Sequence, residues 1–288
     1  MRTMLLRKLV IIGVAALALI APLFASEIAS ALTPHNGAYV ALGDSVTAGD
    51  GLVSVPNPTN IDRACGLSAQ AYPVTVSHAT GMPYVNAGCS GAVIGNLSSA
   101  QNANGVSVRP QLDTAFSYGV PSMISITAGA NDAHWKGMLV TCFASTCGTS
   151  AQSSLEATYI AQAGASMHAQ LQQIKNRSLG NPPLTLVTGY YDPLGPTCTS
   201  YGLKPAEINW VASEVASLNA TIKNSLAGFS FARYVPVTFQ GHSMCDPTPW
   251  VQNIVSPAPF HPNATGQTGY AFVVLVAYNQ AKAAGVKF

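Results

Sequence analysis

The chain has 288 residues, of which 48% are hydrophobic and 8% are charged, whereas charged residues make up about 25% of an average soluble protein. This composition excludes an intrinsically disordered protein, a coiled coil and a protein with an acidic or basic tail. The formal net charge is +2, and without Arg2, Arg7, Lys8 and Glu27 near the N-terminus the basic and acidic residues balance. Because no basic stripe remains to neutralise phosphate groups, nucleic acid is not an expected partner.

The first 31 residues have the pattern of a secretory signal peptide. Three basic residues come first, residues 9–25 form an apolar run, and Ala29-Ser30-Ala31 supplies the small residues that signal peptidase requires. We predict cleavage after Ala31 and a secreted, extracellular mature chain of residues 32–288. The alternative is an uncleaved membrane anchor, because the apolar run is close to spanning length. No later run is long enough to cross a bilayer, so we expect no stable membrane insertion after cleavage.

The mature region alternates between predicted strands and predicted helices. Five short runs rich in apolar and β-branched residues are typical of buried strands; they are residues 38–42, 83–86, 123–127, 184–188 and 233–239. Apolar residues recur at nearly four-residue spacing over 155–174 and 208–226, and a last helix is predicted over about 266–284. Strands separated by helices imply a parallel sheet covered on both faces. We therefore predict a single α/β domain, a three-layer doubly wound parallel sheet.

Polar residues follow several predicted strands, at the sheet edge where doubly wound folds bind ligands. Ser45 follows the first strand, Gly91 lies beyond the second, and Asn131 and Asp132 follow the third. A serine at such a turn can be a nucleophile, or simply a helix N-cap. The backbone N–H of Gly91 and the amide of Asn131 can stabilise an oxyanion, or they can serve a tight turn and an Asx-turn.

His261 lies just before the predicted C-terminal helix, where a loop returns to the same sheet edge. A serine nucleophile needs a base to accept its proton, and histidine is the usual base. The alternative is an ordinary loop or helix-entry residue. Other histidines compete for the role: His78 and His168 in helical stretches, and His134 and His242 in loops.

The six cysteines indicate disulfides, because their number is even and the chain is predicted to be exported. They are Cys65, Cys89, Cys142, Cys147, Cys198 and Cys245. Six cysteines allow 15 pairings, and sequence alone does not choose among them. We favour the sequential pairing because it closes the shortest loops. No CxxC pair occurs and the histidines are scattered, so no metal site is predicted.

Four short blocks together resemble the SGNH, or GDSL, hydrolase family. They are residues 43–49 (GDSVTAG), 90–92 (SGA), 129–132 (GAND) and 261–262 (HP), and the resemblance extends from about residue 36 to the end. It implies a flavodoxin-like SGNH hydrolase domain over residues 32–288. It also implies that Ser45 is the nucleophile and His261 the base, and that Ser45, Gly91 and Asn131 form the oxyanion hole.

Within this family the chain is most similar to the secreted, three-disulfide lipases and esterases of actinobacteria. The similarity rests on residues 241–245 (GHSMC), 249–251 (PWV) and 261–267 (HPNATGQ). In that subgroup the disulfides pair sequentially, which supports the pairing favoured above.

One position departs from the family pattern. The usual final block is DxxH, and Ala258 stands where its aspartate would be. The enzyme could be inactive, a distant carboxylate such as Asp246 could substitute, or a backbone carbonyl could orient the base, as the actinobacterial subgroup does. We favour a Ser45–His261 dyad in which the carbonyl of Ala258 accepts the His261 N–H.

We therefore predict a serine esterase or lipase that acts on a small-molecule or lipid ester, needs no cofactor and is a monomer. A carbohydrate acetyl esterase is an alternative, because fold does not fix the substrate. A second alternative is a catalytically silent binder of lipid or glycan, and its only support is the missing aspartate. The sequence contains neither the GxSxG elbow of the α/β-hydrolase fold nor an HExxH metal motif.

Overall fold

The computed structural model describes residues 35–287, so the predicted signal peptide and its cleavage site lie outside the described residues. The centre of the described region is a five-stranded sheet of order β2-β1-β5-β6-β7, and every neighbouring pair in it is parallel. Its strands are β1 (Tyr39–Gly43), β2 (Tyr84–Asn86), β5 (Met123–Thr127), β6 (Leu184–Thr188) and β7 (Ala232–Val235). The predicted fold class, a doubly wound parallel α/β sheet, is confirmed.

The three central strands are buried on both faces. Every residue of β1, β5 and β6 is buried, which explains why their sequences are continuous apolar runs and do not alternate with polar residues. The hydroxyl groups among them are paired inside the core: Tyr39 with Ser125 at 2.7 Å and Thr127 with Thr188 at 2.8 Å. These hydrogen bonds remove the cost of burying polar side chains between the sheet and its helices.

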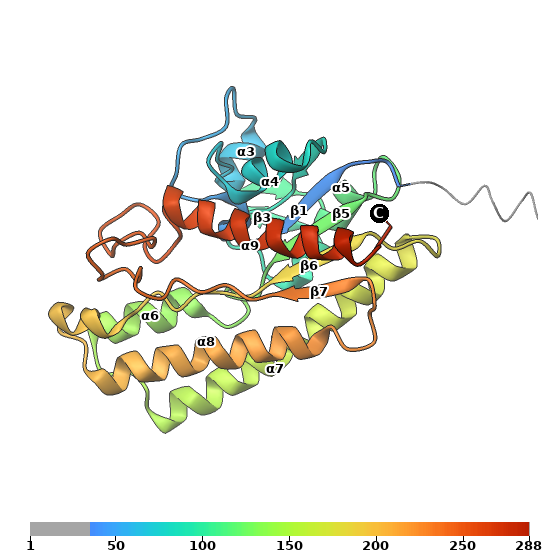
Figure 1. Ribbon diagram of the computed structural model, residues 1–288. Coiled ribbons are helices and arrows are strands. Elements are labelled where there is room, and N and C mark those ends of the chain that lie inside the picture. The colour runs from blue at the N-terminus through green and yellow to red at the C-terminus, as the bar shows by residue number, and fades with distance from the viewer. Residues whose placement is uncertain (1–34, 288) are drawn as a thin grey trace, which may run out of the picture. The chain divides into compact units, whose positions relative to one another are not determined.

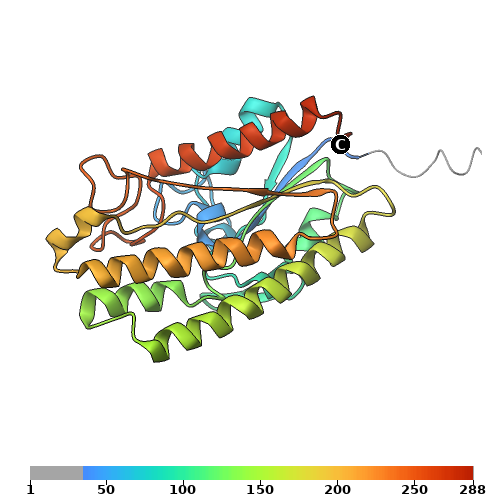
Figure 2. The same cartoon turned by 60° about the horizontal axis from the view of Figure 1, so that its bottom comes forward.

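Long helices cover the sheet on both sides (Figure 1). Helix α4 (Tyr72–Thr80) packs against α9 (Ala264–Ala283) on one face, and α7 (Ser150–Arg177) packs against α8 (Pro205–Ser225) on the other. The strands lie between the two helical layers in the turned view as well (Figure 2). The chain therefore has the three layers that the alternation of strands and helices predicts.

Shorter elements connect the sheet to the surface. They are α2 (Ser45–Ala48), α3 (Asn60–Cys65), α5 (Gln111–Ala115), α6 (Trp135–Ala144), the 3₁₀ helices Ile94–Leu97 and Pro196–Tyr201, and the antiparallel strands β3 (Gln101–Ala103) and β4 (Val106–Val108). Apart from a helix after the turn of Ser45, these elements were not predicted from the sequence. An Asn-Gly pair marks the β3–β4 hairpin, with positive φ at both Asn104 and Gly105, and this pair is a strong hairpin signal.

The last strand and the last helix differ slightly from their predicted bounds. Strand β7 ends at Val235, four residues before the predicted end, because Pro236 follows it and has no N–H to continue the ladder. Helix α9 begins at Ala264, where the side chain of Asn263 accepts the Gly266 N–H as an N-cap.

Three disulfides join the cysteines in sequential order, as favoured from the sequence. They are Cys65–Cys89, Cys142–Cys147 and Cys198–Cys245, and no cysteine among the described residues is free. The first ties the end of α3 to the segment that follows β2. Within residues 35–287, no helix combines the length and the apolar character needed to cross a bilayer.

Candidate active site

Ser45 stands at the sharp turn between β1 and α2. The turn begins at Gly43, which has φ of +139°, and a Cβ there would overlap the Thr127 carbonyl oxygen, so this position requires glycine. Asp44 then caps α2, because its carboxylate accepts the Val46 N–H at 2.9 Å. Ser45 is thereby the first residue of the helix, at the carboxyl end of a central strand.

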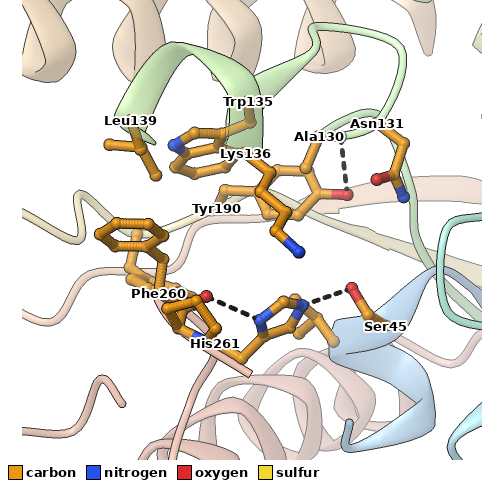
Figure 3. A pocket seen from close by; sticks show the side chains of 12 residues that line it. Ser45, Ala130, Asn131, Trp135, Lys136, Leu139, Tyr190, Phe260 and His261 are labelled. Atoms are coloured by element: carbon orange, nitrogen blue, oxygen red, sulfur yellow. Dashed lines mark hydrogen bonds between the residues drawn. The ribbon is translucent and has the colours of Figure 1, made fainter. Parts of the chain in front are cut away.

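His261 reaches Ser45 from the loop that precedes α9. Its Nε2 lies 2.7 Å from Ser45 Oγ, and its Nδ1 lies 3.0 Å from the carbonyl oxygen of Pro259 (Figure 3). A carbonyl oxygen can only accept a hydrogen bond, so Nδ1 carries the ring proton in this arrangement. Nε2 is therefore free to accept the proton of the Ser45 hydroxyl.

The carbonyl that faces the His261 ring is that of Pro259, so the assignment to Ala258 is wrong. The carbonyl of Ala258 accepts the backbone N–H of His261 at 3.4 Å and is thereby directed along the chain. Phe260 has φ of +68°, and its own carbonyl accepts the Tyr191 hydroxyl at 2.6 Å. The turn therefore leaves the Pro259 carbonyl facing the imidazole. Asp246, the other proposed substitute, binds Thr197 and the Ser243 N–H instead.

The segment of Gly91 lies beside the turn that carries Ser45. The Cys89 N–H donates to the Gly43 carbonyl at 3.0 Å, and the Cys65–Cys89 disulfide holds the same segment. Gly91 has φ of +77°. In the described part of the chain, no acceptor receives a hydrogen bond from the N–H of Ser45 or of Gly91, so both remain available to a ligand.

Asn131 lines the same pocket as Ser45 and His261. Its Nδ2 donates to the Ala92 carbonyl at 2.9 Å, which fixes the amide and leaves the second Nδ2 hydrogen for a ligand. Its neighbour Asp132 does not line the pocket. The carboxylate of Asp132 accepts the Ile94 N–H at 2.9 Å, so it holds the 3₁₀ helix in place.

The competing histidines make other contacts. His168 Nδ1 lies 3.0 Å from the Ser225 carbonyl oxygen, and His134 Nδ1 lies 3.0 Å from that of Asp132. His242 stacks on Trp250 with ring centroids 4.2 Å apart. Among residues 35–287, no group of three or more His, Cys, Asp or Glu side chains is placed to hold a metal ion.

A buried carboxyl–phenol pair beneath the site was not predicted. Asp44 is fully buried, and burial raises its pKa to about 7, although the hydrogen bond from Tyr190 opposes this effect. The Tyr190 hydroxyl donates to Asp44 Oδ2 at 2.5 Å and accepts the Ala130 N–H at 3.2 Å. It therefore links the turn of Ser45 to the turn of Asn131. Tyr190 lies two residues beyond the end of β6, and this strand-end position is the signal that could have identified it.

The pocket beside Ser45 is apolar at one end (Figure 3). It is lined by Ser45, Val46, Ala130, Asn131, Trp135, Lys136, Leu139, Tyr190, Tyr191, Pro259, Phe260 and His261. Helix α6 supplies Trp135 and Leu139, while Phe260 comes from the loop of His261. The lining at this end is therefore apolar and aromatic, as in most sites that bind small molecules.

A parallel sheet with a hydrogen-bonded serine–histidine pair at the carboxyl ends of its strands is typical of α/β ester hydrolases. Comparison with known proteins identifies the family. The model of the GDSL-like Lipase/Acylhydrolase family matches residues 41–268. The chain belongs to this family and hydrolyses carboxylic esters.

Individual relatives agree with this assignment. A lipase of Streptomyces rimosus is 32% identical over 244 residues, covering 81% of this chain and 83% of the relative. The crystal structure of an extracellular lipase from that organism has a TM-score of 0.63 at 28% identity, covering 83% of this chain and 98% of that one. Phospholipase A1 from Streptomyces albidoflavus shares the fold, with a TM-score of 0.64 at 24% identity over 83% of this chain and 98% of that one.

Proposed function

We propose that the chain is a secreted, monomeric serine esterase or lipase in which Ser45 is the nucleophile and His261 the base. The observation that carries this proposal is the hydrogen bond of 2.7 Å between His261 Nε2 and Ser45 Oγ. The second hydrogen bond, from His261 Nδ1 to the Pro259 carbonyl, replaces the carboxylate that orients such a base in most serine hydrolases. This hydrogen bond supports an active enzyme over a catalytically silent binder.

In the first half of the reaction, Ser45 Oγ attacks the ester carbonyl carbon and its proton passes to His261 Nε2. The N–H groups of Ser45 and Gly91 and the amide of Asn131 donate hydrogen bonds to the oxyanion that forms. His261 then gives its proton to the leaving alcohol as the carbon–oxygen bond breaks. The product of this half is an ester of the Ser45 hydroxyl with the acyl group.

In the second half, water attacks this acyl-enzyme and His261 accepts the proton of the water. The same three donors hold the second oxyanion. The bond to Ser45 Oγ breaks, Oγ takes back the proton from His261, and the carboxylic acid leaves. Apart from the ester and one water molecule, no reactant is needed to balance protons or electrons.

The apolar end of the pocket favours an acyl chain over the acetyl group of a carbohydrate ester. Trp135, Leu139 and Phe260 are all buried by more than nine-tenths, and each lines the pocket. Three disulfides support an oxidising compartment, and the predicted signal peptide over residues 1–31 supports export.

The test is hydrolysis of p-nitrophenyl esters of increasing acyl length by the chain of residues 32–288. The Ser45→Ala variant is expected to lose about 10⁶-fold in kcat, as other serine hydrolases do without their nucleophile. Ser213→Ala, an exposed serine on α8, is the matched control and is expected to keep wild-type kcat. Wild-type activity that survives Ser45→Ala would contradict the proposal.

A further inference from the structure

Among residues 35–287, Lys136 is the only lysine or arginine that lines the pocket of Ser45 and His261, and no aspartate or glutamate of that range lines it. It is the second residue of α6 and is exposed. Its side chain extends toward Ser45 and His261 (Figure 3). The ammonium group therefore faces the place where the ester reacts.

No charged group in the described region neutralises this ammonium. The ion pairs found there are Arg177–Asp113 and Lys204–Glu207, and no hydrogen bond from Lys136 is present. Asp44, which precedes Ser45, is buried and already accepts hydrogen bonds from Val46 and Tyr190. The positive charge at the pocket is thus unpaired in the absence of a substrate.

The stability of α6 does not explain a lysine at this position. A cation in the first turn of a helix opposes the helix dipole, and an anionic residue would be preferred there. Substrate recognition does explain it, because a compact, strongly hydrated ammonium on a flexible stem binds phosphate and carboxylate groups.

The position of the ammonium indicates which part of the ester it meets. Trp135, Leu139 and Phe260 form the apolar end of the pocket, where the acyl chain would lie. His261 must lie beside the leaving alcohol in order to protonate it. Because Lys136 extends toward His261 and away from the apolar end (Figure 3), it would meet the alcohol part.

We propose that the enzyme prefers esters whose alcohol carries an anionic group, phosphate or carboxylate, close to the scissile bond, and that Lys136 selects them. This inference rests on the function proposed above. It names a substrate class: acyl esters of anionic alcohols.

The test compares pairs of monomeric, water-soluble esters that differ only in the anion. In one pair, a short-chain lysophosphatidate is compared with the monoacylglycerol of the same acyl chain. In the other, the acyl ester of a hydroxynitrobenzoate is compared with that of the matching hydroxynitrobenzamide. The readout is the ratio of kcat/KM for the anionic ester to kcat/KM for the neutral ester. A preference in the first pair alone identifies phosphate as the anion, and a preference in both pairs identifies anions in general.

Lys136→Met is expected to lower this ratio about fivefold, the size expected of a partly exposed ion pair. Lys136→Arg is expected to retain most of the preference. Lys282→Met, at the far end of α9 from His261, is the matched control and is expected to keep the wild-type ratio. Raising the ionic strength from about 0.05 M to about 0.5 M should lower the wild-type ratio toward that of Lys136→Met, because salt screens exposed charges.

An equal ratio in wild type and Lys136→Met would overturn the inference while leaving the esterase function intact. Equal losses of kcat on both members of a pair would also overturn it, because they would place the ammonium at the oxyanion. A wild type that hydrolyses p-nitrophenyl esters but neither member of a pair would overturn the inference alone. A wild type that hydrolyses none of these esters would overturn the proposed function, and the inference with it.

Discussion

In the proposed dyad, the Pro259 carbonyl takes the place of the carboxylate that orients the histidine in most serine hydrolases, but it carries only a partial charge. It fixes the ring orientation and the tautomer of His261 through one hydrogen bond of 3.0 Å. A neutral acceptor stabilises the imidazolium less than an anion does, but it also avoids the cost of burying a carboxylate. The geometry depends on the turn at Phe260 and on the hydrogen bond that its carbonyl accepts from Tyr191.

Restoring the aspartate of the family pattern is therefore expected to harm the enzyme. Ala258 is only 4% exposed, and its Cβ lies against Gly51, so an Ala258→Asp side chain would bury a carboxylate without a partner. We expect Ala258→Asp to lower the free energy of unfolding by several kcal/mol and not to raise kcat. Thermal unfolding and ester hydrolysis measure the two effects.

Ala258→Asn is the control for that variant, because it has nearly the same volume and no charge. It is expected to destabilise the protein less than Ala258→Asp. A tenfold gain of kcat in Ala258→Asp would mean that the carboxylate reaches His261 and that our account of this turn is wrong.

At the scale of elements, the ends of three neighbouring strands are tied together beneath the site. Asp44 follows β1, Ala130 follows β5 and Tyr190 follows β6, and the Tyr190 hydroxyl bonds to the other two. The backbone of Tyr190 is itself held by Asn219 of α8, which accepts its N–H at 2.7 Å and donates to its carbonyl. One phenol thus sets the spacing of the turns that carry Ser45 and Asn131.

Tyr190→Phe tests this role. The variant leaves Asp44 Oδ2 and the Ala130 N–H without their partner, which costs about 1–3 kcal/mol of stability. Because the turns of Ser45 and Asn131 lose their common support, we also expect kcat to fall about tenfold, since a misplacement of the order of 1 Å is costly in catalysis.

Tyr270→Phe is the matched control for this prediction. Tyr270 is also fully buried, and its hydroxyl donates to the Gly189 carbonyl at 3.2 Å, but it supports neither turn. The Tyr270→Phe variant is expected to have a lower free energy of unfolding and nearly the wild-type kcat. Equal kcat in the two variants would show that the hydrogen bonds of the Tyr190 hydroxyl serve stability alone.

The sheet and the four candidate site positions could be predicted from the sequence because both depend on local pattern. Buried parallel strands are continuous apolar runs, and Ser45, Gly91 and Asn131 stand in short motifs after strands. Tyr190 and Lys136 belong to no motif, so their placement depends on packing between distant segments. The sequence-based prediction placed the orienting carbonyl at Ala258, one residue before Pro259. Every residue has a carbonyl, and only the turn at Phe260 decides which one faces His261.

At the scale of the whole molecule, several buried carboxyl groups make stability depend on pH. Burial raises the pKa of Asp44 and of Glu156 to about 7 and that of Asp192 to about 6, and for Glu156 the neighbouring Glu214 adds to the effect. In an unfolded chain such groups titrate near pH 4. Between about pH 4 and 7 the folded protein therefore holds more protons than the unfolded one, so the free energy of unfolding falls as the pH rises.

We expect the Tm to be higher at about pH 5 than at about pH 8, and Glu156→Gln to reduce the difference. Glutamine resembles the protonated acid, so the variant should match wild type at about pH 5 and exceed it at about pH 8 by about 2 kcal/mol. Thermal unfolding of both proteins at both pH values measures this. A Tm that rises with pH in wild type, or an unchanged difference in Glu156→Gln, would contradict the assignment.

Ser45 and His261 are 216 residues apart in the sequence. We therefore expect ester hydrolysis to appear only in chains that have folded completely. The meeting of these two residues requires the central strands to be in register and α9 to be docked, which Gln267 secures by hydrogen bonds to Tyr72 and Val46. Contacts between such distant segments form late, because closing long loops is costly in entropy. During refolding, helical circular dichroism should therefore recover before turnover does. A chain truncated before His261 lacks the proposed base, so we expect it to be inactive.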